Sequence, residues 1–228
     1  MTRRSVAQGV AGAAVMIAVL TLLSRLAGFG RTLAFTNAVG ADSTGDAYQA
    51  ANTVPNIVFE VVAGGALAAL VVPMLAGGIA VGDREQVRRT ASALLGWTLL
   101  VLTPLAVAIA VFAEPIARVL LGAGESVETD VAARFLLVFA PQVVLYGIGI
   151  VLAGILQAHR HFAAPALAPL LSSVVVASAY LAFAALDGSR DVAGLDTPAE
   201  LVLGVGTTLG VVVLSLSLLV PVRRLRLG

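Results

Sequence analysis

The chain has 228 residues, of which 59% are hydrophobic and only 12% are charged, and its mean hydropathy is +1.01. A soluble domain of this length cannot hide so much apolar sequence in one core, so the composition excludes an ordinary soluble protein and indicates a polytopic membrane protein. The net charge of +1 comes without a basic tail, which argues against nucleic-acid binding, and the absence of cysteine excludes disulfides and thiolate metal sites.

Long apolar stretches predict six membrane-spanning helices, because each crossing needs about 20 residues to cover ~30 Å at ~1.5 Å per residue. The apolar residues form continuous blocks, so the expected fold class is all-α: a polytopic membrane helical bundle that occupies residues 1–228 as a single transmembrane lobe. The six helices are expected near residues 8–38, 47–80, 90–112, 131–157, 163–186 and 200–222.

The first span carries two arginines, Arg25 and Arg31. A guanidinium keeps its charge and costs ~2.5 to 3.5 kcal/mol at bilayer depth, so it is usually kept for a cavity or a partner. On an ideal helix Ser24, Arg25, Gly28 and Arg31 fall within about 120° of arc, so we expect them to border one polar groove. The alternative is that both arginines extend from a tilted helix toward the lipid headgroups.

The second span is longer than one straight crossing and is interrupted by polar residues, proline and glycine, so we expect it to be bent or broken. Asp46 stands near its start, Pro55 leaves one helical carbonyl without its usual donor, and Gly65 follows later. Asn52 and Asn56 can supply hydrogen bonds where the backbone opens toward a cavity. We expect these two amides to face the arginines of the first span.

Glu60 is the one acid that the sequence places inside the membrane. It has two interpretations. It either forms an ion pair with Arg25 or Arg31 that locks two helices together, or it serves as a cation or proton site, because a carboxylate in a low dielectric can change its charge during a transport cycle.

Arginines occupy every second connection or terminus, and acids occupy the others. Because short cytoplasmic loops are rich in Lys and Arg, the arginine-rich connections are predicted to be cytoplasmic, and so are both termini. Two termini on one side require an even number of spans. The arginines are Arg3, Arg4, Arg84, Arg88, Arg89, Arg160, Arg223, Arg224 and Arg226. The opposite acids are Asp42, Asp46, Glu114, Glu125, Glu128, Asp130, Asp187, Asp191, Asp196 and Glu200.

No enzymatic motif accompanies these features. The sequence has no nucleophile with a base, no Walker loop and no cluster of metal ligands, and His159 and His161 lack a third ligand nearby in sequence. We therefore expect neither an enzyme nor a metal site nor a bound cofactor.

Several motifs, in their order and spacing, resemble the MurJ (MviN) family of lipid II flippases, and the similarity runs over essentially the whole chain. They are SRLAGFGR at residues 24–31, GDAY at 45–48, Pro55-Asn56, Gly65-Ala66 leading to Val72-Pro73, and ILQAHRHFAAPA at 155–166. The resemblance implies a transporter of the multidrug/oligosaccharidyl-lipid/polysaccharide superfamily in the bacterial plasma membrane. Its substrate would be a polyprenyl-pyrophosphate-linked glycan such as lipid II, moved among membrane lipids by alternating access.

In that family, arginines of the first helix face a cationic cavity, and Arg25 and Arg31 match those positions. Arg25 is expected to matter more, because it lies deeper along its span. Members of that family resemble two six-helix lobes followed by extra helices. This chain resembles the first of the two lobes. The second lobe is therefore expected in a missing segment or in another chain, with transport coupled to an ion gradient or the membrane potential.

Where the family usually has basic residues after Pro-Asn, this chain has Phe59 and Glu60, and Gly64 replaces an acid. These departures leave two alternatives to a lipid II flippase. One is an exporter of drugs or of other polyprenyl glycans. A drug exporter would have a cavity dominated by acids such as Glu60. The other is a non-transporting membrane module that binds cell-wall machinery, with Arg25 and Arg31 fully paired inside the bundle.

Overall fold

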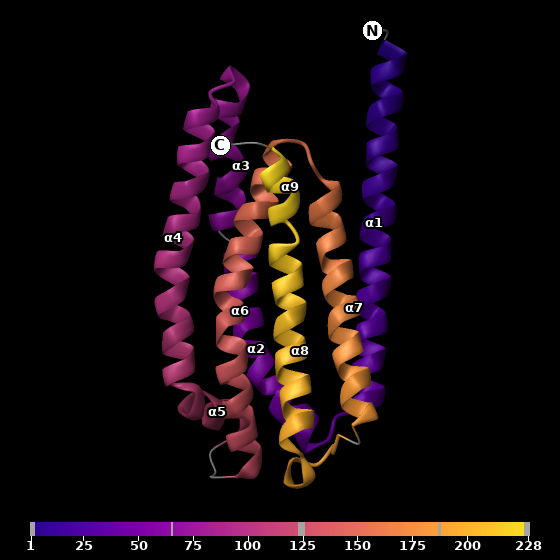
Figure 1. Ribbon diagram of the computed structural model, residues 1–228, viewed down its shortest axis with the longest axis vertical. Coiled ribbons are helices and arrows are strands. Elements are labelled where there is room, and N and C mark those ends of the chain that lie inside the picture. Colours follow the sequence, from indigo (N-terminus) through magenta and orange to yellow (C-terminus); the bar gives the residue numbers. More distant parts are fainter. Residues whose placement is uncertain (1–2, 65, 123–125, 187, 226–228) are drawn as a thin grey trace.

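A computed structural model describes residues 3–64, 66–122, 126–186 and 188–225, and within these ranges the regular structure is helical (Figure 1). The expected all-α membrane bundle is confirmed. Its helices are α1 (Arg3–Ala38), α2 (Ser43–Gly64), α3 (Ala66–Val81), α4 (Arg84–Val111), α5 (Ala113–Leu121), α6 (Val127–Ala158), α7 (Ala163–Ala185), the 3-10 turn η1 (Val192–Gly194), α8 (Thr197–Leu216) and α9 (Leu219–Arg224).

Five segments of the described chain are long and apolar enough to cross a membrane: Val15–Ala38, Arg84–Val111, Val127–Ala158, Ala163–Ala185 and Thr197–Arg224. They correspond to five of the six expected spans. The count of six is approximate, because the expected span over residues 47–80 corresponds to α2 and α3, and neither is among these five segments. Polar residues lower the hydropathy of α2, and α3 is a shorter apolar helix. Gly65, between α2 and α3, lies outside the described residues.

The helices run up and down the long axis in turn (Figure 1). α1, α4 and α7 run in one direction, and α2 with α3, α6, and α8 with α9 return in the other. The described chain therefore starts and ends at the same end of the bundle. This arrangement agrees with the even number of crossings expected from the charge pattern.

α6 lies at the centre of the bundle and packs against α2, α3, α4, α5 and α8. Its phenylalanines Phe135 and Phe139 are fully buried. Its glycines allow close approach, because a Cβ at Gly147 would lie 2.3 Å from Leu102 of α4 and one at Gly154 would lie 2.5 Å from Val71 of α3. Small residues serve this purpose in membrane bundles, where close backbone contact stabilises helix association.

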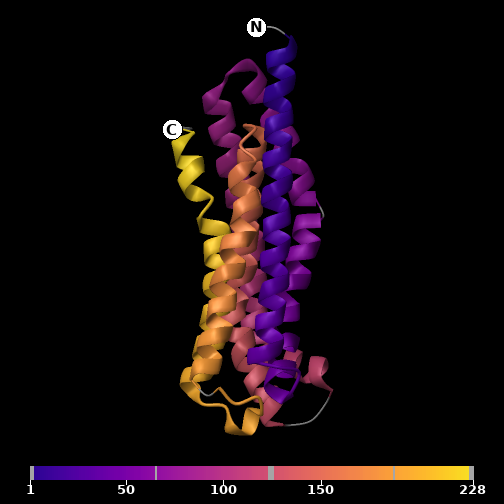
Figure 2. The ribbon, with the colours of Figure 1, turned by 90° about the vertical axis from the view of Figure 1, so that its right-hand side faces the viewer.

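α1 lies at the edge of the bundle and packs mainly against α7, as Figure 2 shows from the side on which α1 lies. The Ser24 hydroxyl ties the two helices together by donating a hydrogen bond to the carbonyl oxygen of Ala166 at 2.7 Å. On α1, Leu22, Leu26 and Phe29 are exposed. Such a surface suits lipid tails or a second group of helices.

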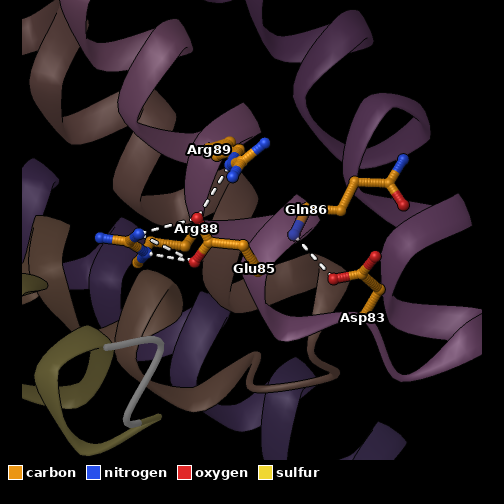
Figure 3. Close-up of polar contacts among 5 residues, drawn as sticks. All are labelled: Asp83, Glu85, Gln86, Arg88 and Arg89. Carbon is orange, nitrogen blue, oxygen red and sulfur yellow. Dashed lines mark hydrogen bonds and ion pairs between the residues drawn. The ribbon is translucent and has the colours of Figure 1, made fainter.

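The two ends of the bundle differ in charge. The end with Arg3 also holds the connections with Arg84, Arg88 and Arg89, with Arg160, and with Arg223 and Arg224 (Figure 1). There Glu85 pairs with Arg88 and with Arg89, both at 2.8 Å, and Asp83 caps α4 by accepting from the backbone N–H of Gln86 at 2.9 Å (Figure 3). Exposed ion pairs of this kind add little stability to the fold. The main contribution of these arginines is the positive charge that they give to this end of the bundle.

The opposite end holds most of the acids and a loop with its own hydrogen bonds. Arg134 of α6 pairs with Glu200 of α8 at 2.7 Å. The backbone N–H of Thr44 donates to the carbonyl oxygen of Arg190 at 2.9 Å, and the Thr44 hydroxyl donates to that of Ser189 at 2.9 Å. The start of α2 is thereby fixed to the connection between α7 and α8.

Candidate functional site

A cavity of about 390 Å³ lies among α1, α2, α6, α7 and α8. Five of the residues singled out in the sequence line it: Ser24, Gly28, Arg31, Asn52 and Asn56. The first three come from one face of α1, and the two amides come from α2. The structure thus brings these residues of the first and second predicted spans together around one space.

Arg31 is the one charged side chain among the described residues that line this cavity. It is exposed, and within the described ranges it has neither a hydrogen bond nor an ion pair. A Cβ added at Gly28, one helical turn earlier, would meet nothing within 4 Å. A side chain at this position would project into open space, so Gly28 is not needed for close helix packing.

Arg25 differs from Arg31. Its side chain is exposed and is not among those lining the cavity. Ideal helix geometry explains the difference: Ser24, Gly28 and Arg31 fall within about 60° of arc, and Arg25 lies about 60° beyond Gly28. The face that borders the cavity is narrower than the sequence suggested.

Glu60 is also exposed and absent from the cavity lining. Among the described residues it forms no ion pair with Arg25 or Arg31. The interhelical lock expected as its structural role is thus not found. Asp46 is exposed in the first turn of α2, where a carboxylate favours the positive end of the helix dipole.

α2 remains helical through the buried Pro55 and presents its two amides to the cavity. The Asn56 side-chain oxygen accepts a hydrogen bond from the Tyr146 hydroxyl of α6 at 3.3 Å. The Tyr146 ring lies against Phe59, with centroids 4.6 Å apart. Asn52 has no described hydrogen bond, so its amide is available to a ligand.

Hydroxyl groups that sequence reasoning did not single out complete the polar wall. Ser172 and Ser173 of α7 and Thr207 of α8 are all buried and line the cavity. Their helices are apolar overall, so nothing in the sequence distinguishes them from ordinary serines and threonines of membrane helices. Only the packing of α7 against α1, and of α8 against α7, brings them to the same cavity as Arg31.

Tyr48 is buried and is hydrogen-bonded to Thr207, one of the residues that line the cavity. Its hydroxyl lies 2.8 Å from the Thr207 hydroxyl and 2.9 Å from that of Tyr180. Its ring meets those of Phe135 and Phe139 nearly edge to face, with centroids 5.6 and 5.5 Å away. Tyr48 belongs to the GDAY motif, but the sequence could not indicate that its hydroxyl contacts a cavity-lining residue of α8.

Comparisons with known proteins agree with this architecture. A family model described as "Lipid II flippase MurJ" matches residues 35–228. A protein of Buchnera aphidicola subsp. Schizaphis graminum (strain Sg), named probable lipid II flippase MurJ, is 25% identical over 164 residues, which cover 71% of this chain and 32% of that protein. One of Rhizobium tropici with the same name is 26% identical over 162 residues, covering 70% of this chain and 30% of that protein.

A solved structure described as lipid II flippase MurJ in an inward closed conformation matches with a TM-score of 0.72 and 19% identity. The match covers 90% of this chain and 41% of that chain, and it shows a shared fold. This chain spans about a third of the length of the two curated relatives. Since the family model matches most of the sequence, the chain belongs to the lipid II flippase MurJ family.

Proposed function

We propose that this chain supplies one lobe of a flippase that moves a polyprenyl-pyrophosphate-linked glycan, such as lipid II, across the bacterial plasma membrane. The observation that carries the proposal is the cavity of about 390 Å³ in which Arg31 lies without an ionic partner among the described residues. The names of the curated relatives support lipid II as the substrate.

The chemistry of the lining suits a pyrophosphate attached to a sugar. The planar guanidinium of Arg31 can donate two parallel hydrogen bonds to phosphate oxygens, and such charge-assisted contacts strengthen where water is excluded. The amide of Asn52 and the hydroxyls of Ser172 and Ser173 can bond glycan hydroxyls. One cavity therefore offers a cation for the phosphates and neutral polar groups for the sugar.

The two competing functions fit the cavity less well. A drug or cation exporter needs acids at its binding site, but Glu60 is not among the lining residues. A non-transporting module needs both arginines paired within the bundle, whereas the described residues contain no ion pair of Arg25 or Arg31. Both observations favour an anionic ligand.

Alternating access requires a second lobe against which this one can move. The curated relatives are about three times as long as the matched segments, which supports a second lobe in the working transporter, on the same or another chain. The arginine-rich end of the bundle would face the cytoplasm.

The test is outer-leaflet accessibility of the lipid-linked precursor in cells depleted of their own flippase, with this lobe expressed together with the second lobe. Replacing Arg31 with Ala removes a charge-assisted contact of about 1.5 to 3 kcal/mol, so binding should fall about ten-fold or more. Arg31→Lys keeps the charge and loses the bidentate geometry, so activity should fall in the order Arg, Lys, Ala.

Arg25→Ala is the matched control, because Arg25 is on the same helix and does not line the cavity. It should reduce transport less than Arg31→Ala. This order reverses the expectation drawn from depth along the span. Full transport by the Arg31→Ala variant at normal expression would contradict the proposal.

A further inference from the structure

A second, smaller cavity of about 130 Å³ adjoins the first. The two share four lining residues, Phe59, Tyr146, Pro169 and Leu214. The remaining wall of the smaller cavity comes from α6, α7, α8 and Leu218, which precedes α9, and it is almost wholly apolar. A polar space with one cation thus borders an apolar space, with the Phe59 and Tyr146 rings at their common wall.

We infer that the smaller cavity binds the first isoprene unit of a polyprenyl pyrophosphate, the five carbons next to the phosphate bound at Arg31. This inference rests on the proposed function and adds to it a lipid subsite within this lobe. The ligand chemistry follows from the pairing of the two cavities: an anionic group and a short apolar group must lie side by side in one molecule.

The size of the cavity agrees with a group of five carbons. Apolar cavities of about 150 Å³ in proteins stay dry and accept a molecule as large as benzene. The smaller cavity has a comparable volume of about 130 Å³, and its wall includes Ile150, Ala153 and Ala168. It has room for one isoprene unit and not for the rest of a polyprenyl chain, which would continue into lipid.

The position of the cavity also agrees with a prenyl chain. Its lining residues Ala153, Pro165 and Leu218 lie closer to the arginine-rich end of the bundle than Thr207 and Val176, which line the polar cavity. A ligand that occupies both spaces therefore lies along the bundle axis, with its glycan toward Thr207 and Val176 and its prenyl chain toward the arginine-rich end.

Two soluble probes can test the subsite on the full chain in detergent: dimethylallyl pyrophosphate, which carries one isoprene unit, and methyl pyrophosphate, which lacks it. Burial of the extra carbons should make dimethylallyl pyrophosphate bind about ten-fold more tightly or better. Ala153→Leu fills the smaller cavity, so this ratio should fall to about one, while the affinity for methyl pyrophosphate stays unchanged.

Ala184→Leu is the matched control, since Ala184 is exposed on α7 and lines neither cavity. It should leave the ratio intact. Ile150→Ala is a second variant that enlarges the cavity without overpacking it, and it should lower the ratio several-fold. Thermal unfolding and helical content of each variant establish that it is folded.

The outcomes separate the two proposals. A ratio that survives both Ala153→Leu and Ile150→Ala, with methyl pyrophosphate binding weakened by Arg31→Gln, would overturn the prenyl subsite alone. Binding of both probes that is insensitive to Arg31→Gln would contradict the proposed function. Failure of the wild-type chain to bind either probe would contradict both.

Discussion

Tyr48 joins α2 to two other helices through one hydroxyl group. Thr207 donates its own proton to the carbonyl oxygen of Leu203 at 2.7 Å, so Tyr48 must donate to Thr207 and accept from Tyr180. Tyr180 of α7 thus donates to Tyr48 of α2, and Tyr48 donates to Thr207 of α8. Because Thr207 lines the cavity, this chain of hydrogen bonds holds that part of the cavity wall in place.

We predict that Tyr48→Phe destabilises the protein more than Tyr180→Phe. The first change removes two hydrogen bonds and the second removes one, and hydrogen bonds within membrane bundles contribute about 0.6 kcal/mol on average. Tyr48→Phe should thus cost about 1 kcal/mol and Tyr180→Phe about half as much. Reversible unfolding in mixed micelles measures both, and a larger loss in Tyr180→Phe would contradict the central place of Tyr48 in this chain of hydrogen bonds.

Helix periodicity predicts some of the cavity residues and fails for others. Ser24, Gly28 and Arg31 repeat at three- and four-residue spacing, so a helical face alone groups them. Arg25 lies at the edge of that face, where a small rotation decides between cavity and surface. The contact of Tyr48 with Thr207 spans 159 residues, and no local pattern indicates which helices will pack together.

At the scale of elements, glycines of α6 set how closely its neighbours approach. Gly154 is buried against Val71 of α3, and α2 and α3 both pack along α6. Hydropathy predicted the five long spans because their apolar runs are continuous. Hydropathy alone does not mark α2 as a spanning helix, because its polar side chains Asn52 and Asn56 face a cavity that forms only on folding.

Gly154→Ala should therefore destabilise the bundle by about 1 to 3 kcal/mol, since the new Cβ would lie 2.5 Å from Val71 and force a shift of the backbone. Gly96→Ala in α4 is the control, because a Cβ there meets nothing within 4 Å. Alanine is the better helix former, so the control should be as stable as the original or slightly more so. Thermal unfolding in detergent compares the two, and equal midpoints would show that α3 yields to α6 without cost.

At the scale of the whole molecule, charge and fold give consistent information about topology. The connection 82–83, which Arg84, Arg88 and Arg89 of α4 follow, and the connection 159–162, which contains Arg160, lie at the end where the described chain starts and ends. The 3-10 turn η1 and the acids around it lie at the other end (Figure 1). The sequence predicted this alternation from loop composition alone. It could do so because loop charge is a local property that needs no knowledge of which helices touch.

The last prediction is that the arginine-rich end faces the cytoplasm. The chain contains no cysteine, so single cysteines can be introduced without background: Gln86→Cys next to the arginines of α4, and Ala193→Cys beside Asp191. Both positions are exposed. A membrane-impermeant maleimide should label Ala193→Cys in intact spheroplasts and Gln86→Cys only after permeabilisation. Labelling of both from outside would contradict the up-and-down topology, and labelling of Gln86→Cys alone would reverse the orientation of the lobe.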